Sequence, residues 1–216
     1  NNPTGAILTK EELEGLAAVL RDTNIAVLSD EIYAELTYGR RHVSIASIDG
    51  MRERTILVSG FSKAYAMTGW RLGYLCAPKE IVNQMYKIHQ YGIMCAPTAS
   101  QFAGIEAMER GDEDIEYMKA EYNRRRVMLL DGFRSLGLSC FEPEGAFYEF
   151  PHIAVDGMDS ETFCERLLHE AGVAIVPGTA FGECGEGFAR VSYAYSVQHL
   201  EQALERMNGF LKKLRG

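Results

Sequence analysis

The chain has 216 residues, 47% of them hydrophobic and 24% charged, and a formal net charge of −8 at pH 7. This composition is ordinary for a globular protein, and no apolar run approaches the roughly 20 residues that span a membrane. The acidic balance disfavours a nucleic acid or an anionic membrane as a partner, so we expect small-molecule ligands.

The first residues predict a turn followed by a helix. Residues 1–5 read NNPTG, a turn signal with no initiator Met, and we expect the chain to be a fragment of a longer polypeptide. Thr9 and Glu12 have the spacing of a capping box, which predicts a helix that runs to about residue 21.

Short apolar runs predict the buried strands of a mostly parallel sheet. The runs at residues 25–28 and 55–58 each end in a polar segment, and residues 72–77 are expected to add a strand to the same sheet. Ligands of such sheets bind beyond the carboxyl ends of the strands. Asp30 and Lys63 are both predicted to lie there.

The rest of the chain predicts three further helices and then a small α+β domain. The helices are expected at residues 79–91, 98–110 and 114–136, and the last of them leads from one domain to the next. The following elements are expected to be a strand at 146–150, a helix at 160–171, strands at 173–176 and 189–193, and a helix at 197–214. We therefore expect an α/β fold in two parts, a mostly parallel-sheet domain at residues 1–115 and a small α+β domain at residues 116–216.

Cysteine and histidine positions give no sign of a disulfide framework or a metal site. The 5 cysteines are odd in number and include no CxxC pair, and the 5 histidines lack the spacing of metal ligands. We therefore expect no bound metal and a reducing, cytoplasmic location.

The strongest motif is GFSKAYAMTGWRLG at residues 60–73. Its lysine, Lys63, can act as a nucleophile when uncharged, and Arg71 offers a planar, permanently charged group for a phosphate. The segment resembles the cofactor-attachment signature of the class I and II aminotransferases. The resemblance implies that Lys63 forms a Schiff base with pyridoxal phosphate, and that Arg71 and the hydroxyl of Ser62 bind the cofactor phosphate.

Two more motifs resemble elements of that family. In residues 30–33, DEIY, the resemblance implies that Asp30 pairs with the pyridine nitrogen of the cofactor and that the Tyr33 hydroxyl reaches its phenolic oxygen. A carboxylate at that nitrogen keeps it protonated, so the ring can accept electrons. Asn2, in the family's N-P-x-G element, is implied to donate to the same phenolic oxygen and to contact the substrate.

The last predicted strand carries the candidate substrate-binding residue. Arg190 resembles the arginine of the family that binds the substrate α-carboxylate, and its planar fork suits a bidentate contact. Phe147, in a stretch that resembles the family's G-x-F/Y segment, is a candidate for the pocket wall.

The resemblance implies a fold type I enzyme that moves an amino group between an amino acid and a 2-oxo acid by a ping-pong mechanism. It also implies that residues 1–115 are the C-terminal part of the domain that binds the cofactor. Lys63 is implied to be both the anchor and the general acid–base. The intact protein is expected to be a homodimer, whereas this chain by itself is expected to bind the cofactor weakly. Two alternatives stay open: another enzyme of the group, such as a C–S lyase, and the aminotransferase-like sensor domain of a transcription regulator.

Overall fold

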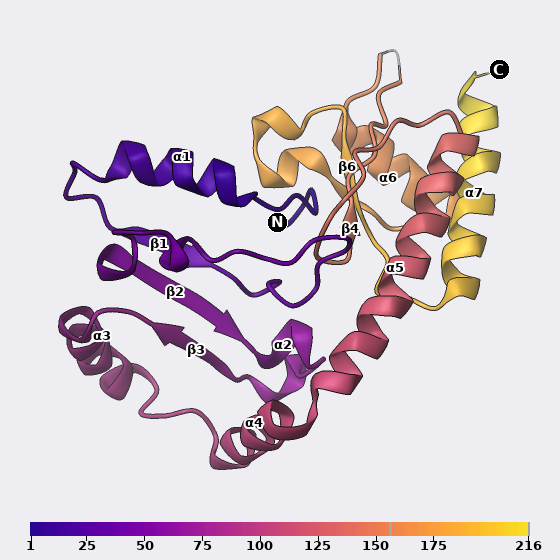
Figure 1. Ribbon diagram of the computed structural model, residues 1–216. Coiled ribbons are helices and arrows are strands. Elements are labelled where there is room, and N and C mark those ends of the chain that lie inside the picture. The colour runs from indigo at the N-terminus through magenta and orange to yellow at the C-terminus, as the bar shows by residue number, and fades with distance from the viewer. Residues whose placement is uncertain (156, 216) are drawn as a thin grey trace. The chain divides into compact units, whose positions relative to one another are not determined.

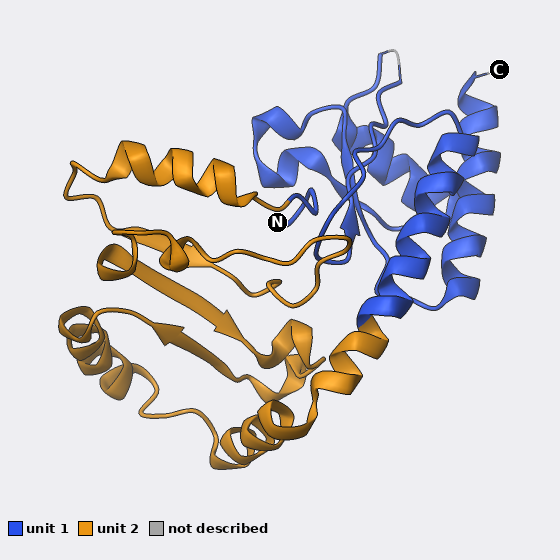
Figure 2. Cartoon of the chain, in the orientation of Figure 1, with its two compact units in different colours: residues 1–6, 119–216 blue, residues 7–118 orange. Residues whose placement is uncertain are grey.

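A computed structural model describes residues 1–155 and 157–215 (Figure 1). The chain divides into two compact units: unit 1 consists of residues 1–6 and 119–216, and unit 2 of residues 7–118 (Figure 2). Each unit combines strands with helices, as the predicted α/β class requires. None of the helices in the described ranges is long and apolar enough to cross a membrane.

Unit 2 is built on a three-stranded sheet in the order β1-β2-β3. Its helices and strands are α1 (Lys10–Leu20), β1 (Val27–Asp30), β2 (Thr55–Gly60), α2 (Phe61–Ala64), β3 (Gly73–Cys76), α3 (Lys79–Gly92) and α4 (Thr98–Arg110). Strands β1 and β2 are parallel, whereas β3 pairs with β2 in the antiparallel direction. The predicted third strand is therefore confirmed, but it runs opposite to β2, because the short link through α2 leaves no room for a crossover helix.

Local sequence explains how unit 2 begins. Thr9 caps α1, since its hydroxyl accepts from Glu12 N at 3.2 Å and the Glu12 carboxylate accepts from Thr9 N at 2.7 Å. The predicted capping box is thus confirmed. The buried face of α1 contributes to an apolar cluster beside β1, made of Leu13, Ala17, Ile45, Ile48 and Met51.

Unit 1 contains a second three-stranded sheet, in the order β4-β6-β5, whose pairings are antiparallel. Its elements are the C-terminal part of α5 (Asp112–Ser135), which begins in unit 2, and then β4 (Tyr148–Glu149), α6 (Ser160–Ala171), β5 (Val176–Pro177), β6 (Ala189–Ser192) and α7 (Val197–Arg215). Helices α5 and α7 lie side by side (Figure 1), and a Cβ at Gly132 would be only 2.4 Å from a methyl group of Leu204. The middle strand of this sheet, β6, carries Arg190.

The first six residues group with unit 1, although the sequence-based division places them in domain 1–115. The physical reason is a close approach at Gly5, whose carbonyl oxygen accepts from Glu144 N and Gly145 N at 2.9 and 2.8 Å. Gly5 has φ +71°, and a Cβ there would lie 2.3 Å from Pro143 Cβ, so only glycine fits. The predicted domains 1–115 and 116–216 stay a prediction for the whole protein.

Candidate active site

Three of the predicted site residues lie at one edge of the sheet in unit 2. Asp30 ends β1 and is paired in register with Val58 of the parallel strand β2. The next residue of the chain donates its backbone N–H to Val58 O at 2.8 Å, which holds the turn after β1 against β2. Lys63 follows β2 in α2, and its Nζ lies 5.8 Å from the centre of the Tyr33 ring. The sheet therefore brings an acid, a phenol and an amine to its carboxyl edge.

The backbone around Lys63 is held by a close approach between two segments. A Cβ at Gly60 would lie 3.0 Å from both Gly73 Cα and Leu72 O, so a side chain at position 60 would push the strands apart. Phe61 N also donates to Leu72 O at 3.2 Å. These contacts fix the start of α2, and so the place of Lys63, against the segment that begins at Arg71.

Ser62 and Arg71 are the predicted phosphate contacts. Ser62 precedes Lys63 in α2 and is partly buried. Arg71 adopts the left-handed conformation, with φ 52° and ψ 47°, and its Nη1 donates to Thr68 O at 2.8 Å. A non-glycine residue in this conformation is held there by its surroundings at some energetic cost. Arg71 is exposed, and the next residue, Leu72, contacts the start of α2 through its carbonyl oxygen.

The chemistry of these groups fits pyridoxal phosphate. The cofactor requires an amine for its aldehyde, an acid for its ring nitrogen and cationic or hydroxyl donors for its phosphate. Unit 2 supplies an amine in Lys63 and a carboxylate in Asp30 at the same sheet edge. It supplies the phosphate donors from the neighbouring α2 and from the segment that the close approach at Gly60 holds beside it.

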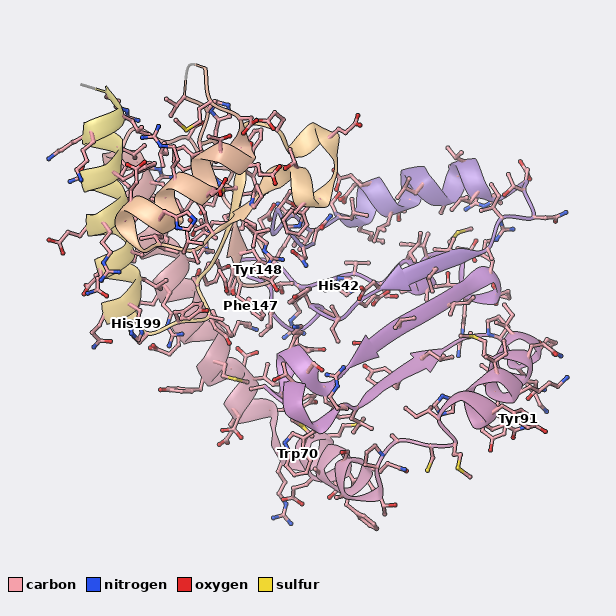
Figure 3. The ribbon with its side chains drawn as sticks, turned by 180° about the vertical axis from the view of Figure 1, so that it is seen from behind. His42, Trp70, Tyr91, Phe147, Tyr148 and His199 are labelled. Carbon is pink, nitrogen blue, oxygen red and sulfur yellow. The ribbon has the colours of Figure 1, made fainter. Side chains whose placement is uncertain are left out.

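A buried acid beside this edge was not identified as a site residue from the sequence. Glu31 is only 6% exposed; it accepts from Ser29 and Ser44 hydroxyls at 3.0 and 2.6 Å and lies 2.7 Å from His42 Nε2. Burial raises the pKa of its carboxyl, but the hydrogen bonds from His42 and Ser44 outweigh burial and leave the pKa below its ordinary value. Figure 3 shows His42 near the end of β1. The network ties the turn that carries Asp30 and Tyr33 to the loop before β2.

The other two predicted residues, Asn2 and Arg190, meet in unit 1. Arg190 Nη1 donates to Asn2 Oδ1 at 2.8 Å across 188 residues of sequence. Because a guanidinium can only donate, Asn2 presents its carbonyl oxygen to Arg190, and its amide N–H groups face elsewhere as donors. Both predicted roles, a donor to a phenolic oxygen and a carboxylate-binding fork, are compatible with this orientation.

Two aromatic residues beside Arg190 were missed in the sequence. The Arg190 guanidinium carbon lies 4.6 Å from the centre of the Tyr148 ring and 4.8 Å from that of Phe181. Tyr148 directly follows Phe147 in the G-x-F/Y stretch. Because side chains alternate between the two faces of a strand, the pairing of β4 with β6 could have placed Tyr148 on the same face of the sheet as Arg190. Nothing in the local pattern could have paired Phe181 with it. Phe147, the candidate wall, lies 4.7 Å from the Tyr148 ring (Figure 3).

Known proteins resemble the chain over its whole length. The family model described as "Aminotransferase class I and II" matches residues 1–207. "Putative aminotransferase YugH" of Bacillus subtilis is 52% identical over 213 residues, which cover 99% of this chain and 55% of that protein. "Probable N-acetyl-LL-diaminopimelate aminotransferase" of the same organism is 46% identical over 215 residues, covering 100% of this chain and 54% of the relative. The chain thus spans about half the length of these relatives.

Solved structures agree with the fold. The crystal structure of an aromatic aminotransferase from Pyrococcus horikoshii superposes with a TM-score of 0.95 at 47% identity. The match covers 98% of this chain and 57% of the other one. The predicted α/β fold and the predicted resemblance are both confirmed.

Proposed function

This chain belongs to the class I and II aminotransferases, and we propose that the whole protein transfers an amino group between an amino acid and a 2-oxo acid, with pyridoxal phosphate as its cofactor. The observation that carries the proposal is the meeting of Lys63, Tyr33 and Asp30 at one sheet edge. An amine, a phenol and an acid at the end of adjacent parallel strands are the groups that this cofactor chemistry needs.

The proposal gives each site residue one role toward the cofactor. Lys63 would hold it covalently, Asp30 would keep its ring nitrogen protonated, and Ser62 and Arg71 would bind its phosphate. Asn2 and Tyr33 would donate to its phenolic oxygen. When bound, the cofactor supplies a ring that accepts the electrons released at the substrate Cα.

The chain's own side chains then carry out the proton transfer. Arg190 would grip the substrate α-carboxylate and so orient the Cα–H bond. Lys63, once its amine is free, would take the proton from the substrate Cα and deliver it to C4′ of the cofactor, acting first as general base and then as general acid. Asp30 would hold the proton on the ring nitrogen while charge develops, because a nearby carboxylate favours the protonated form of a basic group.

Covalent labelling tests the anchor directly. We expect borohydride reduction of the whole protein with pyridoxal phosphate to attach the cofactor at Lys63, as read by peptide mass spectrometry. Lys63→Ala should lose the visible absorbance of the bound cofactor, whereas Lys87→Ala, an exposed lysine on α3 that bonds Gln84, should keep it. Labelling of another lysine, or none, would remove the basis of the proposal.

Product analysis separates transamination from its alternatives. Incubation with pairs of amino acids and 2-oxo acids should yield the exchanged pair. Pyruvate with sulfide or ammonia as the sole products would point to a lyase, and cofactor binding without any turnover would point to a sensor domain. A titration with single amino acids, followed by absorbance, identifies the side chain that the protein accepts.

We also propose that the whole protein is a cytoplasmic homodimer. Its family membership supports the dimer, and the five cysteines without a CxxC pair suit a reducing compartment. Light scattering on the whole protein measures its mass in solution, and a mass of one subunit at micromolar concentration would contradict the dimer.

A further inference from the structure

We propose that Tyr148 and Phe181 position the Arg190 guanidinium for carboxylate binding. The inference rests on the proposed function, in which Arg190 binds the substrate carboxylate, and it assigns a role to two residues to which the proposed function gives none. We call Tyr148 and Phe181 the aromatic pair.

The aromatic pair contacts the guanidinium through its ring faces. The guanidinium carbon lies within 5 Å of both ring centres, at 4.6 and 4.8 Å, well inside the roughly 6 Å range of cation–π attraction. An aromatic ring that covers the face of a guanidinium leaves the N–H groups at its edge, and these are the groups that bind a carboxylate. One of them is already directed to Asn2 at 2.8 Å.

Both members of the pair come from restrained backbone. Tyr148 is 8% exposed and pairs with Ser192 of β6. Arg190 precedes Ser192 by two residues in that strand, so Arg190, Ser192 and Tyr148 lie on the same face of the sheet. Phe181 ends a short helical turn, Gly178–Phe181, that follows β5.

The turn that carries Phe181 is itself held by backbone contacts. Gly178 N donates to Phe188 O at 2.8 Å, and a Cβ at Gly178 would lie 2.0 Å from Gly185 O. The rings are therefore placed by the sheet and by a turn that tolerates no side chain at Gly178.

A restrained guanidinium binds more tightly because less freedom is lost on binding. An arginine side chain has several rotatable bonds, and fixing a flexible side chain opposes association. Contacts with two rings and with Asn2 limit that freedom before the substrate arrives. The rings also replace water over the faces of the cation, which strengthens its attraction for an anion.

The test measures binding without turnover. The whole protein, loaded with pyridoxal phosphate, is titrated by calorimetry with two amine-free probes, succinate and 3-phenylpropanoate. We expect Phe181→Leu and Tyr148→Leu each to weaken probe binding roughly three- to tenfold, the effect of losing one cation–π contact. Phe181→Tyr and Tyr148→Phe keep a ring face and should bind nearly as the wild type does.

A double-mutant cycle separates positioning from a general loss of structure. In an Arg190→Gln background, which has no cation for the rings to hold, Phe181→Leu should change probe binding less than about twofold. Phe141→Leu is the matched control, because that ring is 54% exposed and lies outside β4, β6 and the turn that carries Phe181. It should leave probe binding unchanged in both backgrounds.

Each outcome distinguishes the two proposals. If Arg190→Gln leaves the binding of both probes unchanged, or neither probe binds the wild type, the carboxylate role of Arg190 is wrong, and the inference falls with it. If Arg190→Gln weakens probe binding but Phe181→Leu and Tyr148→Leu do not, only the positioning role is overturned. The same holds if Phe181→Leu weakens probe binding as much in the Arg190→Gln background as it does in the wild type.

Discussion

Glu149 should make the protein less stable as the pH rises, and its replacement by glutamine should remove that dependence. This residue of β4 is fully buried, and among the described residues no donor lies within hydrogen-bond distance of either carboxylate oxygen. Burial raises the pKa of Glu149 to about 9, and the opposing charges of Arg126 and Arg134 do not offset it. The side chain is therefore protonated in the folded protein at neutral pH.

The magnitude follows from the difference in proton affinity between the two states. Below pH 4.5, the pKa of the carboxyl in the unfolded state, both states are protonated, and the free energy of unfolding does not change with the ionisation of Glu149. Above that value the unfolded state gains stability by ionising, and each pH unit lowers the free energy of unfolding by about 1.4 kcal/mol until the folded group ionises near 9. At pH 7 the loss is about 3 kcal/mol.

Urea unfolding of the whole protein between pH 5.5 and 7.5 measures this slope. The wild type should lose about 3 kcal/mol relative to Glu149→Gln over that interval, whatever the fixed cost of burying the amide. Glu165→Gln, which replaces an exposed carboxylate on α6, should follow the wild type at each pH. Parallel curves for the wild type and Glu149→Gln would refute a protonated, buried Glu149. An infrared band of a protonated carboxyl at pH 7, absent from Glu149→Gln, is an independent check.

Three other substitutions test local features by denaturation or activity. Thr9→Ala removes the capping hydroxyl of α1 and should lower the free energy of unfolding by about 1 kcal/mol, as measured in urea. Glu31→Gln should destabilise the protein by about 1–3 kcal/mol at pH 6, because it weakens the bond to His42. Since the carboxyl pKa is lowered in the folded state, the deficit should shrink as the pH falls below 4.5, and a deficit that does not change with pH would contradict the charged network. Gly60→Ala should lower transaminase activity and cofactor absorbance, since its Cβ would lie 3.0 Å from backbone atoms, while Gly69→Ala, with open space around it, should not. Equal activities of these two variants would show that the close approach does not place the amine.

Features that depend on near neighbours in the sequence were predictable. The ends of α4 (Thr98–Arg110) and α6 (Ser160–Ala171) agree with the predicted helices, because apolar spacing and flanking residues determine a helix over a few turns. The strands were harder: the run predicted at 25–28 forms a strand at Val27–Asp30, since short apolar runs do not define where pairing begins. Strand β3 could be predicted to exist, but its direction depended on the length of the link before it.

The residue types that could carry out transamination follow from the sequence alone, because their motifs are contiguous and contain Lys63, Asp30 and Arg190. Their partners follow only from the tertiary structure. The pairing of β4 with β6 places Tyr148 on the same face of the sheet as Arg190 and buries Glu149 on the opposite face. The hydrogen bonds of Gly5 hold the first residues of the chain against residues 144 and 145, and Asn2 bonds Arg190 there. Contacts within one turn of a helix are determined by residues that are close in the sequence, whereas contacts across a sheet depend on which distant strands pair and in which register.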